Sequence, residues 1–121
     1  MELGLLLQYL LPGDLSLYFD LVEAKNTDTE ILHLYLDEKK IIPPEHLNKQ
    51  IISYGFTDPV HIQDFPLRGK QVYLVVRRRK WKDKSTDTIY TREWNITAKG
   101  TSYSKEFATF LKEVFRQSTN K

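Results

Sequence analysis

The strongest chemical feature of this sequence is a run of cationic side chains. Eight lysines and arginines lie between residues 68 and 84, where Asp83 is the one acid. They are Arg68, Lys70, Arg77, Arg78, Arg79, Lys80, Lys82 and Lys84. Because contacts from lysine and arginine to phosphate dominate the affinity of proteins for nucleic acids, the run predicts a nucleic-acid-binding surface. Arg92 flanks it and Trp81 lies within it, so we include both in the predicted site.

Residue types that support catalysis are present, but they form no recognisable catalytic motif. The sequence has neither a glycine-rich phosphate loop nor a G-x-S-x-G nucleophile turn. His61 and Asp64 are three residues apart on a segment that reads as extended, which places them on opposite faces of a strand. We therefore expect no catalytic residues and no enzymatic activity.

Metal, cofactor and membrane binding are also not expected. The chain has no cysteine, and its three histidines share no ligand-like spacing. The absence of cysteine fits a reducing compartment, so we expect a cytoplasmic protein. The apolar segment at 1–11 is shorter than the roughly 20 residues needed to span a bilayer. It is followed by Pro12-Gly13-Asp14, not by the small residues that close a signal peptide.

The net charge of +2 hides two regions of opposite sign. Up to Pro66 the chain has four Lys and Arg against eleven Asp and Glu. From Leu67 onward it has fourteen against five. Such asymmetry predicts two parts of the molecule with different surroundings.

Hydrophobic patterns predict a single α+β domain over 1–121, built on antiparallel β-hairpins of about five strands with a helix at each end. Residues 1–12 form a helix that is apolar on almost every side, so it must be buried in the core or in a partner. The β-rich region covers 17–96 and begins with a hairpin formed by 17–24 and 31–36. Residues 103–118 have apolar side chains at helical spacing, with Ser102 or Ser104 as a possible N-cap.

The basic run falls on a predicted hairpin, with strands at 71–81 and 88–96 joined by the polar loop 83–87. A symmetric loop pairs Trp81 with Tyr90, Arg79 with Arg92 and Arg77 with Trp94, and it sets Arg78 opposite Glu93. Both faces of the strand at 71–81 are apolar in its first half and cationic in its second half, so we expect the far end of the hairpin to project into solvent as a ribbon. Trp81 and Trp94 would stiffen this ribbon. A two-stranded ribbon fits the major groove of DNA.

The segment from Ile62 to Leu74, followed by Arg77-Arg78-Arg79-Lys80-Trp81, resembles a known family. It is similar to the separately encoded N-terminal-region proteins of ISAon-type bacterial insertion-sequence transposases, over essentially the whole chain. More distantly it resembles the N-terminal zinc ribbons of larger DDE transposases, through Asp64, Phe65, Pro66, Gly69, Val72 and Leu74. The ribbon cysteines are lost, since those positions fall near Asp83 and Thr86, so this resemblance implies a metal-free fold.

The resemblance implies that the chain recognises the ends of an insertion element, at its terminal repeats, or serves in assembly, together with a separately encoded DDE-type catalytic subunit. The residues leave open whether the chain forms a homo-oligomer. Two alternatives remain open from the residues. The chain could be a protein-interaction module that uses its apolar N-terminal helix, or it could bind structured RNA, because a basic ribbon does not distinguish the two polymers by composition.

Overall fold

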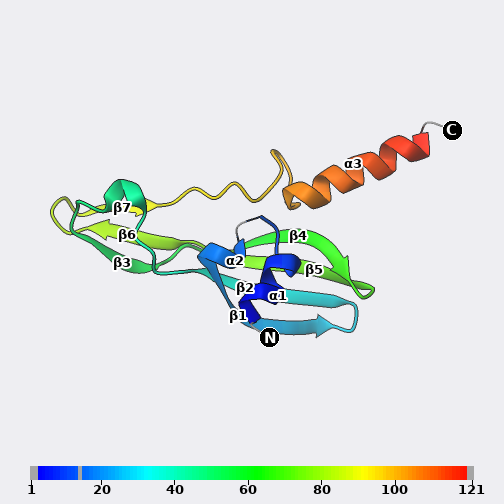
Figure 1. The fold of residues 1–121 in the computed structure, drawn as a ribbon, viewed down its shortest axis with the longest axis horizontal. Coiled ribbons are helices and arrows are strands. Elements are labelled where there is room, and N and C mark those ends of the chain that lie inside the picture. Colours follow the sequence, from blue (N-terminus) through cyan, green and yellow to red (C-terminus); the bar gives the residue numbers. More distant parts are fainter. Residues whose placement is uncertain (1–2, 14, 120–121) are drawn as a thin grey trace.

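The computed structural model describes residues 3–13 and 15–119, and it is an α+β fold with a helix near each end (Figure 1). The fold class expected from the sequence is therefore confirmed. The helices are α1 (Leu3–Leu10), α2 (Leu15–Tyr18) and α3 (Lys105–Thr119), with a 3-10 turn, η1 (Pro44–His46). The strands are β1 (Phe19–Asp28), β2 (Ile31–Glu38), β3 (Ile51–Phe56), β4 (Val60–Leu67), β5 (Lys70–Arg77), β6 (Arg79–Asp83) and β7 (Thr88–Thr91).

The strands form two sheets where the sequence predicted one set of about five strands. Sheet A has the order β1-β2-β5-β4, and sheet B has the order β3-β6-β7. The β1–β2 hairpin is antiparallel, as predicted, but β2 and β5 pair in parallel, with Leu34 opposite Leu74. Sheet B occupies the left of Figure 1 and sheet A the centre and right.

One face of sheet A makes the hydrophobic core. Alternation along the two central strands turns Leu34, Leu36, Leu74 and Val76 to this face, where all four are buried. Leu11, Leu15 and Phe19 cover them from the N-terminal side. Burial of apolar surface stabilises the fold by about 25 cal/mol per Å², so this cluster is the main source of stability in sheet A.

The predicted strand at 71–81 is two strands that belong to different sheets. The chain leaves sheet A at Arg78: before it, β5 pairs with β4, and after it, β6 pairs with β3. The segment 57–59 connects β3 to β4 at the same place. Thr57 satisfies the crossing backbone, since its amide donates to the Arg78 carbonyl at 2.8 Å and its hydroxyl accepts from the Arg78 amide at 3.1 Å. The break therefore leaves no unpaired backbone group at Arg78.

The predicted strand at 88–96 ends at Thr91, because the chain then turns back to the core of sheet A. Trp94 packs against Tyr18 and Phe19, with ring centroids 5.0 and 5.2 Å apart. Its Nε1 donates to the buried carboxylate of Glu38 at 2.8 Å. Residues 92–96 therefore do not pair as a strand, because packing of the large Trp94 ring against the core stabilises a different path of the chain.

The helices at the two ends are only partly covered. In α1, Leu7 packs on the core, whereas Leu5, Leu6, Tyr9 and Leu10 are exposed, and residues 1–2 of the predicted helix lie outside the described residues. Helix α3 points away from the sheets in Figure 1. Ser104 precedes it, but its hydroxyl donates to Asp64 at 2.7 Å. No helix within 3–13 and 15–119 is long and apolar enough to cross a membrane.

Candidate nucleic-acid interface

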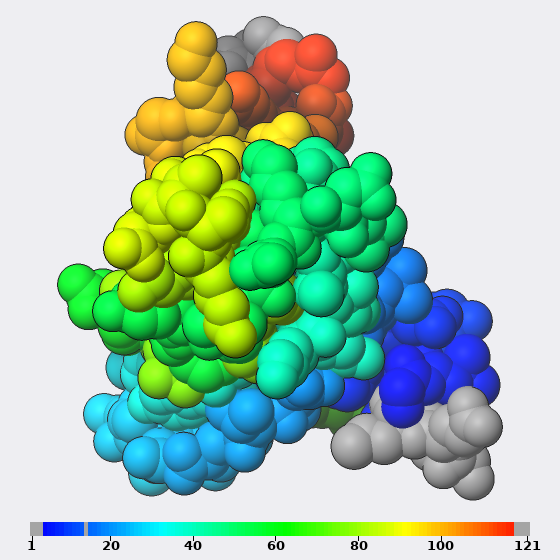
Figure 2. Space-filling model, turned by 90° about the vertical axis from the view of Figure 1, so that its left-hand side faces the viewer, coloured from blue at the N-terminus to red at the C-terminus, as the bar shows by residue number. Residues whose placement is uncertain are grey.

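Charge is divided between the two sheets. Residues 39–56 and 79–92, which build sheet B and its covering loop, have eight Lys and Arg against three Asp and Glu. Residues 19–38 and 60–77, which build sheet A, have four against seven. We call 39–56 and 79–92 the basic end; Figure 2 looks onto it, with β6–β7 in yellow-green beside η1 and β3 in blue-green. The acidic and basic halves of the sequence thus correspond only partly to the two sheets.

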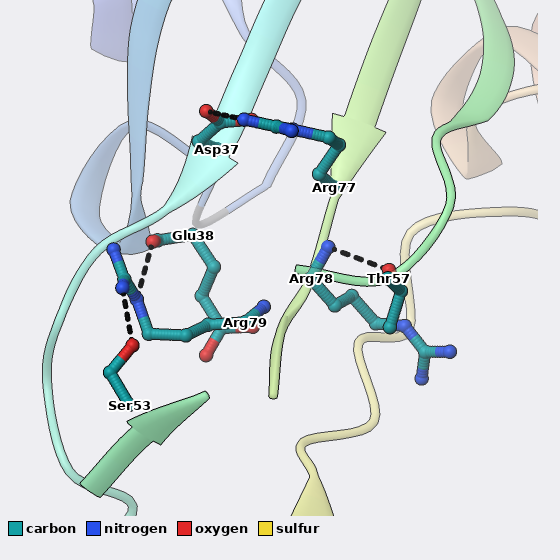
Figure 3. Close-up of polar contacts among 7 residues, drawn as sticks. All are labelled: Asp37, Glu38, Ser53, Thr57, Arg77, Arg78 and Arg79. Atoms are coloured by element: carbon teal, nitrogen blue, oxygen red, sulfur yellow. Dashed lines mark hydrogen bonds and ion pairs between the residues drawn. The ribbon is translucent and has the colours of Figure 1, made fainter. Parts of the chain in front are cut away.

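The first arginine of the predicted site is partly exposed but is paired with an acid of the neighbouring strand (Figure 3). Arg77 donates two hydrogen bonds to the carboxylate of Asp37, from Nε at 2.7 Å and from Nη2 at 2.6 Å. The hydrogen bonds to Asp37 raise the pKa of Arg77 above its ordinary value. Such a bidentate pair fixes the guanidinium in place, so Arg77 serves the contact between β2 and β5.

Arg79 and Arg78 also have partners at the junction of the two sheets. Arg79 donates from Nε to the Glu38 carbonyl at 3.2 Å and from Nη1 to the Ser53 hydroxyl at 2.6 Å (Figure 3). Arg78 lies 3.3 Å from the exposed carboxylate of Glu93, the residue predicted to oppose it. Arg79 therefore connects sheet A to sheet B, whereas Arg77 joins two strands of sheet A. Neither arginine belongs to a free ribbon.

The position of Trp81 also differs from the expectation of a projecting ribbon. Trp81 pairs with Tyr90, as predicted, and also with Ser53 of β3, but its side chain has no exposed surface. The loop after β2 covers this inner face of sheet B, where the ring of His46 lies 4.4 Å from that of Tyr90. Trp81 is thus a core residue of sheet B and cannot touch a ligand there.

The opposite face of sheet B is open, and we call it the outer face. Cross-strand pairs place Lys82 between Ile52 and Ile89, and Lys80 beside Thr91. Lys82 also lies over the ring of Tyr54, with Nζ 5.0 Å from the centroid. The outer face thus has six side chains, of which two are lysines and none is an acid: Ile52, Tyr54, Lys80, Lys82, Ile89 and Thr91. Lys84 follows in the exposed loop. Asp87 lies 3.4 Å from Lys82, but Asp87 is exposed, and such surface pairs are worth at most about 1 kcal/mol.

The remaining predicted cations are not near this face. Arg68 and Lys70 flank the β4–β5 turn, at the opposite end of the molecule in Figure 1, and Lys70 donates to the Thr29 carbonyl. Arg92 stacks on Trp94, with its guanidinium carbon 4.4 Å from the ring centroid. The structure therefore brings together Lys80, Lys82 and Lys84 from the predicted set and separates the others from them.

Other residues of the basic end were not in the predicted site. Lys39, Lys40 and Lys49 come from the loop after β2, which adds positive charge beside sheet B. Tyr54 comes from β3, which lies within the β-rich region predicted at 17–96. The pairing of β3 with β6 joins segments about thirty residues apart, and no local pattern in the sequence reveals it.

A second group of rings lies on the open face of sheet A. His33 stacks on Tyr73 with centroids 5.5 Å apart, and His61 approaches His33 at 6.1 Å. This sheet has more acids than bases, so its charge does not favour a polyanion. Within the described part of the chain, no group of three or more His, Cys, Asp or Glu is placed to hold a metal ion.

The tip of the β6–β7 hairpin is held by Asp83. Its carboxylate accepts hydrogen bonds from the hydroxyl of Ser85 at 2.6 Å and from the Ser85 amide at 2.9 Å. The bond from the hydroxyl is the main cause that lowers the pKa of Asp83 below its ordinary value. The stabilisation from this carboxylate is therefore present above the unfolded-state pKa, near about pH 4, and is lost as the pH falls through the lower folded-state value.

Replacing Ser85 with alanine is expected to raise the pKa of Asp83 towards its ordinary value. NMR titration of the Asp83 carboxyl measures this directly, and urea unfolding below about pH 4 should show a shallower loss of stability with falling pH than in the wild type. Thr86→Ala, which leaves the bonds from Ser85 in place, serves as the control. An unchanged Asp83 pKa in Ser85→Ala would exclude this role of the hydroxyl.

No protein-family model matches the sequence, and no curated protein and no solved structure is significantly similar to it.

Proposed function

We propose that this protein is a non-catalytic DNA-binding domain that contacts duplex DNA through the outer face of sheet B. The observation that carries the proposal is the concentration of positive charge at this end. Lys80 and Lys82 lie on a face without an acid, and Lys84 extends it. Because lysines attract phosphate over the whole surface of a basic patch, such a face increases both the affinity and the association rate for DNA.

The finer role rests on the resemblance to the N-terminal-region proteins of insertion-sequence transposases. In this proposal the DNA is the terminal repeat of an insertion element, and a separately encoded DDE-type subunit in the cytoplasm supplies the catalysis. Contacts from lysines to the phosphate backbone of DNA position a protein on the duplex without reading the base sequence. Preference for the repeat must therefore come from contacts to base edges or from the catalytic subunit.

A second candidate function is protein assembly, and the surface of α1 favours it. Leu5, Leu6 and Leu10 are each exposed by more than a third, and Tyr9 is exposed by 81%. Contiguous apolar surface of this kind marks interaction sites in soluble proteins. This role is compatible with DNA binding, because α1 packs on sheet A and the lysines lie on sheet B.

The test compares binding to a duplex terminal repeat of the parent element, to a scrambled duplex and to double-stranded RNA of the same sequence. The double variant Lys80→Gln/Lys82→Gln should bind both DNA duplexes at least about tenfold more weakly, a loss of about 1.4 kcal/mol. The control variant Lys25→Gln/Lys112→Gln has the same net charge and should bind as the wild type does. Equal losses in the two variants, or tighter binding to RNA than to DNA, would contradict the proposal.

A further inference from the structure

The centre of the outer face is apolar and aromatic, which contacts to duplex phosphates do not require. Ile52 is 37% exposed, Tyr54 50% and Ile89 43%, and all three surround Lys82. A β-strand surface in water usually presents polar side chains between its cations. These three residues therefore form a patch for a flat, uncharged group around Lys82, and Lys80 and Lys84 lie on either side of Lys82 along the chain.

The backbone of β3 presents the ring of Tyr54 to this patch. The pairing of β3 with β6 shifts register between Ser53 and Phe56, which is a β-bulge, and Gly55 within it has a φ of +79°. Bulges re-aim the side chains of the strand that contains them. The Lys82 ammonium lies 5.0 Å from the centroid of the Tyr54 ring, and this cation–π contact restricts the ring while leaving half of the side chain exposed.

We infer that Tyr54 stacks on an unpaired base, and that Ile52 and Ile89 extend the stacking surface while Lys80, Lys82 and Lys84 contact the adjoining phosphates. The inference rests on the proposed function, because it takes DNA as the ligand. Aromatic side chains within a basic groove are the usual means of binding single-stranded nucleic acid, since every base has a π-face. In duplex DNA the bases are already stacked and cannot use this ring.

The lysines of the outer face favour a nucleic acid over a protein as the occupant of the patch. The basic end has an excess of five positive charges, and the six side chains of the outer face include no acid. A second copy of the chain would have to desolvate these lysines against an equally basic face if it docked symmetrically. DNA brings phosphates to the lysines and exposed bases to the ring, so it satisfies both parts of the surface.

The test uses three labelled DNAs: a blunt duplex, the same duplex with an unpaired extension of about eight thymidines, and the single strand alone. The wild type should bind the extended duplex at least about tenfold more tightly than the blunt one. Tyr54→Thr, which keeps a strand-favouring residue, should remove this preference, so that it binds the extended and the blunt duplex equally. Tyr54→Phe should retain the preference, and Tyr9→Ala, which removes an exposed ring on α1, should have no effect.

The outcomes separate this inference from the proposed function. Absence of binding to all three DNAs would overturn both. Binding to the blunt duplex that depends on Lys80 and Lys82, without any preference for the extension, would overturn the stacking inference alone. Retention of the preference in Tyr54→Thr, or its loss in Tyr54→Phe, would also overturn it. A change in sedimentation of Tyr54→Thr with unchanged DNA binding would assign the patch to contact between copies.

Discussion

Replacing Trp81 with alanine is expected to lower the free energy of unfolding by about 3–5 kcal/mol, the usual cost of deleting a buried aromatic side chain. Trp81 is fully buried on the inner face of sheet B, between Ser53 and Tyr90 in register. It lies outside the large apolar cluster of sheet A, and Ile51 is the other buried hydrophobic residue of the strands of sheet B. Urea unfolding measures the loss, and DNA binding should fall with it, since the outer face belongs to the same strands.

Trp81→Phe is the control for this prediction. The buried Nε1 of Trp81 has no hydrogen-bond partner among the described residues. Phenylalanine removes this unsatisfied donor, which offsets part of the cost of the smaller ring. We therefore expect a smaller loss than for alanine. A loss below about 1 kcal/mol in Trp81→Ala would contradict the burial of Trp81 and return it to a surface role.

Replacing Glu38 with alanine is expected to cost about 2–4 kcal/mol, because it removes a buried acceptor that serves two partly buried donors. The Glu38 Oε1 accepts from the Arg79 amide at 3.2 Å and from Trp94 Nε1 at 2.8 Å. These bonds join the end of sheet A to the start of sheet B and to the returning chain. Thermal unfolding followed by circular dichroism and by tryptophan fluorescence measures the effect.

Glu38→Gln provides the matched variant, since both bonds go to Oε1 and an amide oxygen in its place can still accept them. Its loss should be smaller than that of Glu38→Ala. If the two variants lose the same stability, the carboxylate is not the acceptor that holds Trp94. If neither loses stability, the junction described in Figure 3 does not hold the sheets together.

Local patterns predicted the parts of the fold that depend on neighbours in sequence. The β1–β2 hairpin follows from alternation, and the pairing of Trp81 with Tyr90 follows from the symmetric loop. The same symmetric loop predicts that Arg78 lies opposite Glu93, and these two residues form an ion pair although β7 ends at Thr91. The C-terminal helix follows from apolar spacing, with its first residue at Lys105.

Long-range pairing could not be predicted from these patterns. The parallel contact of β2 with β5 places Asp37 beside Arg77, forty residues away, and this ion pair engages the charge of Arg77 within sheet A. The predicted strand at 71–81 is apolar on both faces in its first half and cationic on both faces in its second half. This pattern gives no indication that the chain changes sheet at Arg78. The candidate site accordingly moved from the arginines, which hold the junction, to the lysines and Tyr54 of the outer face.

The salt dependence of DNA binding tests the central claim most directly. If about three to five lysines of the basic end contact phosphates, the logarithm of the binding constant should fall with the logarithm of salt concentration at a slope of roughly −2.7 to −4.5. The variant with Lys80, Lys82 and Lys84 all changed to glutamine should flatten this slope by about 2–3. The variant with Lys25, Arg68 and Lys112 changed to glutamine has the same net charge and should keep the wild-type slope. Equal slopes in the two variants, with both proteins folded, would contradict DNA binding through the outer face of sheet B.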